Sequence, residues 1–211
     1  MIGAKRRGNA QWRPAENSLN HVIDITNDTN ASAEFQLAVE QLRKVSIRPE
    51  LELTQIPAPS KMAHDAIAFS VSIKDESIGD LTNGGTGRFV LLHDLKPHEQ
   101  WGSTFRIVTF AKSALEPSIV EFDDGSNSGW AWLLDALAAS NAPFINEAGT
   151  ATKIFSKGFG ALSQEPNHAE LEVRASWTPT ESFDAHLTAW QNFVCLLAGF
   201  SIDPTDIPRI R

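Results

Sequence analysis

The spacing of apolar positions predicts a helix near the start of the folded region. Apolar residues recur at intervals of three and four, which places them on one helical face: Phe35, Ala38, Val39, Leu42 and Val45. Ser32 is suited to cap the N-terminus, Glu34 fits the first turn, and Pro49 lies beyond the end. A second helix is expected to begin near Ser128.

The last predicted helix has the widest apolar surface in the chain. Its main stripe consists of Phe183, Leu187, Trp190, Val194 and Leu197. The sequence from Thr178 to Glu181 predicts that this helix begins with a capping box and has proline at its first position. Gly199 predicts where the helix ends. Phe193 and Leu196 widen the apolar arc. Such a helix either packs in two directions or meets a partner.

Six segments have the pattern of strands, some alternating between apolar and polar positions and two apolar on both faces. They are residues 51–56, 66–73, 89–92, 105–111, about 150–156, and 169–177. Segments that are apolar on both faces are typical of the middle of a sheet. We therefore expect residues 87–93 and 103–112 to pair there, with residues 94–102 as their surface connection.

The order helix, four strands, helix, two strands, helix predicts an α+β fold. Consecutive strands joined by modest loops favour an antiparallel sheet of about six strands, with the three helices against it. We expect a single domain over residues 32–200. A disordered polar tail is expected at residues 1–31 and an extended C-terminal tail at residues 201–211.

Composition narrows the classes of function. A net charge of −8 and an isoelectric point near 5.2 argue against nucleic-acid binding by the core, which needs a cationic surface. No apolar run is long enough to span a membrane. The single cysteine, Cys195, excludes an internal disulfide and a thiolate zinc site, so we expect a cytoplasmic protein. No dinucleotide or phosphate-loop motif is present, and no cofactor is expected.

The connection between the two central strands holds the strongest candidate metal ligands. Imidazole and carboxylate groups suit zinc or iron, and here they are His93, Asp94, His98 and Glu99. Pro97 prevents a helix from aligning the histidines, and hairpin loops are polar by default. We expect a hairpin tip with Trp101 packed over it. Replacing His93 or His98 by alanine should then cost at most about 0.5 kcal/mol of stability.

Aromatic and cationic residues define a candidate binding surface. Trp130 and Trp132 are two positions apart on a helix, so they diverge by about 200° and at most one can face the sheet squarely. Arg106 interrupts an apolar strand, and Arg174 alternates with glutamates. These arginines either form cross-strand salt bridges or make an anion-binding pair on an open sheet face. Phe193 completes the candidate surface.

Several stretches in the same order resemble one family: RPELELTQIPAP, GRFVLLHD, WGSTFRIVTF, GWAWLLDAL, and LEVRASWTP followed by HLTAW. They are similar to the actinobacterial domain-of-unknown-function family with the number 3000, over about residues 35–200. The resemblance implies an actinobacterial cytoplasmic protein and implies no particular activity, cofactor or catalytic residue. It also implies a gene neighbourhood that includes a ribonuclease D-like protein.

The leading hypothesis from the sequence is a non-catalytic protein- or ligand-binding module. Its partner would be an unknown protein or a second copy of the chain. One alternative is a metal-dependent hydrolase centred on the loop from His93 to Trp101. Another is an accessory protein of RNA metabolism, based on the gene neighbourhood and on a basic cluster formed by Lys5, Arg6, Arg7 and Arg13.

Overall fold

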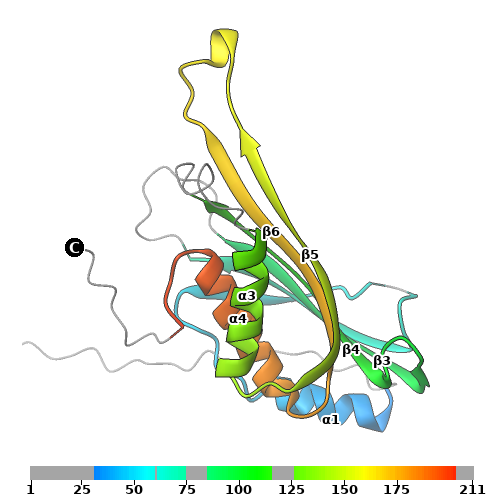
Figure 1. Ribbon diagram of the computed structural model, residues 1–211. Helices are drawn as coiled ribbons and strands as arrows, with labels where there is room; N and C mark the ends of the chain where they lie inside the picture. Colours follow the sequence, from blue (N-terminus) through cyan, green and yellow to red (C-terminus); the bar gives the residue numbers. More distant parts are fainter. Residues whose placement is uncertain (1–30, 60, 75–84, 116–125, 203–211) are drawn as a thin grey trace, which may run out of the picture.

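The computed structural model describes residues 31–59, 61–74, 85–115 and 126–202. The elements in chain order are α1 (Ala33–Leu42), β1 (Leu51–Ile56), β2 (Asp65–Ile73), β3 (Thr86–His98), β4 (Ser103–Leu115), α3 (Ser126–Ala139), β5 (Phe144–Ser156), the 3₁₀ turn η1 (Gly160–Leu162), β6 (His168–Pro179) and α4 (Phe183–Leu197). This order confirms the predicted α+β arrangement (Figure 1). The tails expected at 1–31 and 201–211 lie outside the described residues, apart from residues 31, 201 and 202.

The strands form one six-stranded sheet in the order β1-β2-β3-β4-β6-β5, with every neighbouring pair antiparallel. β3 and β4 are central and pair as predicted, for example Gly87 with Ala111 and His93 with Phe105. The expected connection is too long, because pairing resumes after a register shift and joins His98 to Ser103. Only residues 99–102 make the turn, where Gly102 has a φ of 69°.

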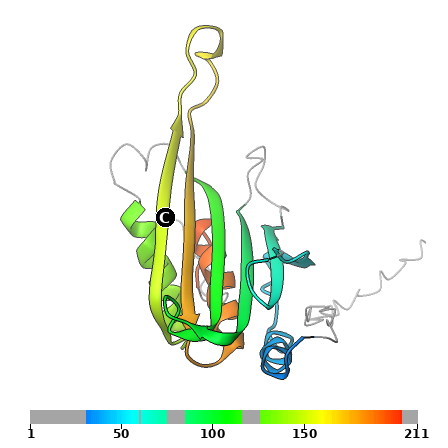
Figure 2. The same ribbon diagram turned by 90° about the vertical axis from the view of Figure 1, so that its right-hand side faces the viewer.

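The helices pack against one face of the sheet, and no helix of the described chain covers the other face (Figure 2). The covered face builds the core, with Phe69, Phe89, Ile107 and Trp177 fully buried. The rings of Phe89 and Trp190 lie 5.6 Å apart between the sheet and α4. This close approach depends on Gly87, where a Cβ would lie 2.9 Å from the Trp190 ring.

The helix α4 packs in two directions, which answers the question raised by its wide apolar arc. It contacts the sheet on one side and both α1 and α3 on others, and most of its side chains are buried. Its end is confirmed at Gly199, which has a φ of 84°. The N–H groups of Gly199 and Phe200 donate to the carbonyl groups of Leu196 and Cys195, which satisfies the last turn.

The predicted start of α4 is wrong. Thr178 is the penultimate residue of β6, and the helix begins at Phe183 without a capping bond from the Ser182 side chain. The free N–H of Phe183 instead donates to the Gln41 side chain of α1 at 2.9 Å. A partner so distant in sequence replaces the local capping box.

β5 is an edge strand and is longer than predicted, because it already begins at Phe144. A bulge between Ile145 and Ala148 shifts its register against β6. The hairpin of β5 and β6 continues past the last pairing of β4, which joins Leu115 to Ala169. Residues 156–168 project beyond this pairing (Figure 1), and together with Ile154 and Phe155, which lie level with the end of β4, they are called the arm, residues 154–168.

Candidate functional site

His93 pairs within β3, as expected for the strand of residues 87–93, but the expectation that it occupies an ordinary surface site next to the loop is wrong. Its side chain is 1% exposed. The imidazole lies between two phenyl rings, with centroids 6.1 Å from Phe35 and 4.4 Å from Phe105. The apolar run of β3 therefore continues one position further than the sequence suggests, and His93 belongs to the interior.

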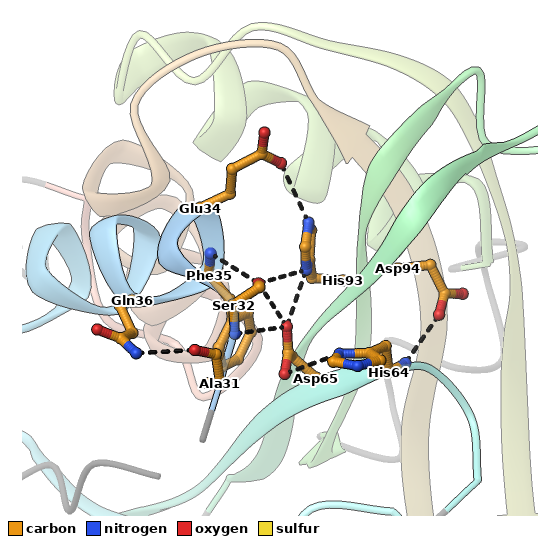
Figure 3. A network of polar contacts seen from close by, with 9 residues as sticks. All are labelled: Ala31, Ser32, Glu34, Phe35, Gln36, His64, Asp65, His93 and Asp94. Atoms are coloured by element: carbon orange, nitrogen blue, oxygen red, sulfur yellow. Dashed lines mark hydrogen bonds and ion pairs between the residues drawn. The ribbon is translucent and has the colours of Figure 1, made fainter. Parts of the chain in front are cut away.

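A polar network surrounds this imidazole and joins α1 to β2 and β3 (Figure 3). The Ser32 hydroxyl donates to Asp65 Oδ2 at 2.6 Å, and His93 Nδ1 lies 3.0 Å from the same oxygen. The other ring nitrogen, Nε2, lies 3.3 Å from Glu34 Oε2. Ser32 also accepts the Phe35 N–H at 3.3 Å, which confirms it as the N-cap of α1.

Asp65 is the central acceptor of this network. Burial raises the pKa of its carboxyl group, but hydrogen bonds from Ser32, His93 and His64 lower it, and the net shift is below the ordinary value. The carboxylate is therefore ionised at neutral pH and contacts the hydroxyl and N–H of Ser32 as well as the rings of His93 and His64. Its oxygens connect the start of α1 to the sheet.

The network lacks the geometry of a serine hydrolase. Such an enzyme needs a serine whose hydroxyl donates to the histidine. Here the Ser32 hydroxyl donates to Asp65 Oδ2 at 2.6 Å, and His93 Nδ1 lies 3.0 Å from the same carboxylate oxygen. Glu34 lies at the opposite ring nitrogen, but the hydroxyl proton of Ser32 is held by Asp65. The arrangement therefore serves the helix cap and does not activate Ser32 as a nucleophile.

The remaining candidate ligands lie toward the β3–β4 turn, and Asp94 is linked to this network because its Oδ1 accepts the His64 N–H at 2.8 Å (Figure 3). His98 Nε2 lies 2.5 Å from Asp94 Oδ2, and its ring stacks on Trp101 with centroids 4.1 Å apart. Glu99 is exposed. Across the described residues, no three His, Cys, Asp or Glu side chains form a group that could hold a metal ion. The four candidate ligands therefore do not come together in one such group.

Arg106 is buried and forms no salt bridge with any described residue. Its guanidinium donates to the carbonyl of Asn146 at 2.7 Å, to Thr178 Oγ1 at 3.1 Å and to Ser176 Oγ at 2.7 Å. All three acceptors are uncharged, and burial lowers the pKa of the guanidinium. Arg106 therefore fixes the bulge of β5 against β6 through neutral oxygens.

Arg174 lies on the same uncovered face and has separate partners. Its Nε donates to Glu172 Oε1 at 2.7 Å, and its guanidinium lies 5.3 Å over the Phe110 ring. A cross-strand salt bridge of the expected kind joins Lys112 to Glu170 at 2.9 Å. The two arginines share a face, but each is engaged in its own contacts.

The aromatic part of the expected binding surface lies on the opposite side of the sheet from the arginines. Trp130 and Trp132 are half-buried and pack against the core, and a Cβ at Gly149 would lie 2.5 Å from the Trp130 ring. Phe193 is 1% exposed, so its assignment to a surface is wrong. The five candidate residues do not form one surface.

A surface pocket of about 520 Å³ lies where the ends of α1 and α3 meet the start of α4. It is lined by Lys44, Val45, Ser46, Ser140, Asn141, Ser182, Asp184, Ala185 and Thr188. The lining is mainly polar, with Lys44 and Asp184 as its charged groups, and it contains no histidine or cysteine.

The arm is the feature that sequence reasoning missed. Exposed large apolar side chains are concentrated on β5 and the arm, namely Ile145, Ile154, Phe155, Phe159 and Leu162. Phe159 is 75% exposed and Leu162 is 61% exposed. The signal in the sequence is the pair of large apolar residues within an otherwise small and polar connection. It becomes meaningful only once the projection of the hairpin is known.

The fold defines an α+β protein whose helices pack on one face of an antiparallel sheet (Figure 2). Residues 31–207 match the model of the family described as Protein of unknown function (DUF3000), and the chain belongs to that family. No curated protein and no solved structure matches the chain. Within the described residues, no helix has the length and apolar character needed to cross a membrane.

Proposed function

We propose that this protein is a non-catalytic protein-binding module and that the arm, residues 154–168, is its binding element. The observation that carries the proposal is the exposure of Phe155, Phe159 and Leu162 on one projecting hairpin. Contiguous exposed apolar groups mark interaction sites on soluble proteins. Aromatic residues are also enriched at the centres of interfaces.

The edge position of β5 supports the same function. Among the described strands, β5 pairs only with β6, so its outer backbone groups have no strand partner. An edge of this kind can accept a strand from another chain through main-chain hydrogen bonds. The arm would add side-chain contacts, which give such pairing its specificity.

The alternatives have weaker support. A metal-dependent hydrolase would require His93 to act with Asp94, His98 and Glu99, but His93 is buried in another network. An accessory role in RNA metabolism rests on the basic cluster of residues 5–13, which lies outside the described residues. Neither alternative has an arrangement of described residues in its favour.

The test compares protein capture by the wild-type chain and by the arm-tip variant Phe159→Ser/Leu162→Ser. The matched control is Leu37→Ser on α1, because Leu37 is 68% exposed but lies far from the arm in sequence. Proteins retained from a cell lysate are quantified for each immobilised chain. We expect the arm-tip variant alone to lose partners by about tenfold or more, the effect of removing interface hot spots. Equal retention by all three chains contradicts the proposal.

A further inference from the structure

We infer that the uncovered face of the sheet binds an extended acidic peptide through Arg88 and Arg174, which lie on either side of Phe110. The register fixes this arrangement, because Phe110 of β4 pairs with Arg88 of β3 and with Arg174 of β6. None of these residues belongs to the arm. The inference therefore goes beyond the proposed function and does not depend on it.

All three side chains point away from the helices. Successive side chains of a strand alternate between the two faces of a sheet. Each of the three is followed in the sequence by a residue of the core, namely Phe89, Ala111 and Ala175. Arg88 and Arg174 are exposed, and Phe110 is half-buried. The arginines are therefore accessible on the face that no described helix covers (Figure 2).

Arg88 is a cation without a neighbouring carboxylate. It forms no ion pair or hydrogen bond with any described residue. Its neighbours on this face are Thr86 and Val90 along β3, Ser70 on β2 and Phe110 on β4. None of them is acidic, although the chain has 26 acidic and 18 basic residues. The centre of this face therefore carries an uncompensated positive charge.

Arg174 is oriented toward the same place. Its guanidinium lies 5.3 Å over the Phe110 ring, and its Nε donates to Glu172 Oε1 at 2.7 Å. Because Phe110 lies between the two arginines, this stacking leans Arg174 toward Arg88. Its two terminal nitrogens donate to no described residue. A guanidinium presents such nitrogens as a fork that matches a carboxylate.

An apolar band lies beside the arginines. It consists of Ala68, Val90 and Val108, which are paired across β2, β3 and β4. Val90 is two residues from Arg88, and both valines are half-buried without a helix over them. An exposed apolar area next to an unpaired cation complements a partner that carries both apolar and acidic side chains.

The spacing of the arginines suits an extended peptide. They are two strands apart, which sets their Cα atoms about 10 Å from each other. Acidic side chains at alternate positions of an extended peptide lie about 7 Å apart on one side. The length and flexibility of the arginine side chains, together with the lean of Arg174 over Phe110, accommodate this difference.

The other charges on this face favour a peptide over a nucleic acid. Nucleic acids are bound through many phosphate contacts, which need an extended cationic surface. Here Lys112 is paired with Glu170, and Glu172 lies beside Arg174. These carboxylates would repel a continuous phosphate backbone, whereas a peptide with two acidic side chains needs only Arg88 and Arg174.

Fluorescence anisotropy with a defined probe tests the inference. The probe is a fluorescein-labelled octapeptide in which glutamate and valine alternate. We expect saturable binding by the full chain, and binding weaker by about tenfold or more for Arg88→Glu and for Arg174→Glu, because a carboxylate then faces the peptide's own carboxylates. Lys44→Glu is the matched control, since Lys44 is exposed in the pocket on the helix side, and it should bind as the wild type does. Melting temperatures establish that all variants are folded.

Two further probes separate the kinds of partner: the same peptide with lysine in place of glutamate, and fluorescein-labelled octauridylate. No saturable binding of the glutamate peptide, equal binding of the lysine peptide, or unchanged binding by the two arginine variants overturns the inference. Tighter binding of octauridylate that is lost in the same variants overturns it in favour of a nucleic acid. The arm-tip variant should bind the glutamate peptide as tightly as the wild type, so the proposed function stands or fails separately by its own test.

Discussion

The imidazole of His93 is packed between two phenyl rings. A carboxylate lies against each of its nitrogens, Asp65 at Nδ1 and Glu34 at Nε2. Its neighbours Ser32 and Asp65 complete the network, so the buried polar atoms have partners. Removing one member of such a network leaves the others desolvated without a hydrogen bond. His93 therefore contributes to the stability of the fold, and the loss of unfolding free energy on replacing it can be predicted.

His93→Ala should lower the free energy of unfolding by about 2–4 kcal/mol, because it creates a cavity and removes a donor to Asp65. His98→Ala is the control, since that ring is about half exposed at the turn and should cost at most about 0.5 kcal/mol. Urea unfolding of the two variants and the wild type measures the difference. Equal costs would show that the buried network contributes nothing specific.

His186 should make stability depend on pH. Burial lowers its pKa from 6.5 to about 4, and its Nδ1 accepts the Trp177 indole N–H at 3.1 Å. The unfolded chain binds the proton first as pH falls, so this stabilisation is complete above pH 6.5 and is lost toward pH 4. The total loss is about 3 kcal/mol.

The variant His186→Asn keeps an acceptor for Trp177 but does not titrate. Its unfolding free energy should therefore fall less steeply than that of the wild type between pH 6.5 and 4. Asp184, whose charge favours the protonated imidazole, stays in both proteins and cancels in the comparison. Parallel curves for the two proteins would refute the assignment of this pH dependence to His186.

At the level of elements, the position of α4 depends on close contact with β3. Gly87→Ala should destabilise the fold by about 1–3 kcal/mol, because the added Cβ would meet both the Trp190 ring and the Phe110 carbonyl at 2.9 Å. Arg88→Ala is the control, since Arg88 is exposed on the uncovered face. Thermal unfolding should separate the two variants, and similar melting temperatures would mean that α4 adjusts freely.

The elements themselves could be predicted well because their patterns are local. The two apolar runs of β3 and β4 indicated central strands, and their pairing is confirmed. The start of α4 could not be predicted, because the sequence around Thr178 satisfies a capping pattern while the strand uses that residue to bind Arg106. Its actual cap comes from Gln41, which no local pattern can indicate.

The site was harder to predict than the fold. The order of residues shows that His93 follows an apolar run, but its contact with Asp65 arises only from the pairing of β2 with β3. Arg106 was expected to need a carboxylate, whereas the β5 bulge supplies neutral oxygens. The exposure of Phe159 depends on the projection of the arm, which periodicity does not reveal.

At the level of the whole molecule, the helices and the core lie on one face of the sheet, and the arm that we propose to bind a partner lies at its β5 edge (Figure 1). The core and the helix contacts lie on the covered face, while the arm extends beyond the last pairing of β4. The arm adds few buried side chains to the core. Its exposed apolar groups are therefore better explained by association than by folding.

The most direct test of this account is protein capture by a chain whose arm has been shortened. Ser156 and His168 are cross-strand partners, so an Asn-Gly turn can replace residues 157–167 without disturbing the sheet. We predict that the shortened chain retains about tenfold less protein from a cell lysate than the full chain, with a similar melting temperature. Equal retention by both chains would contradict the assignment of the arm to protein binding.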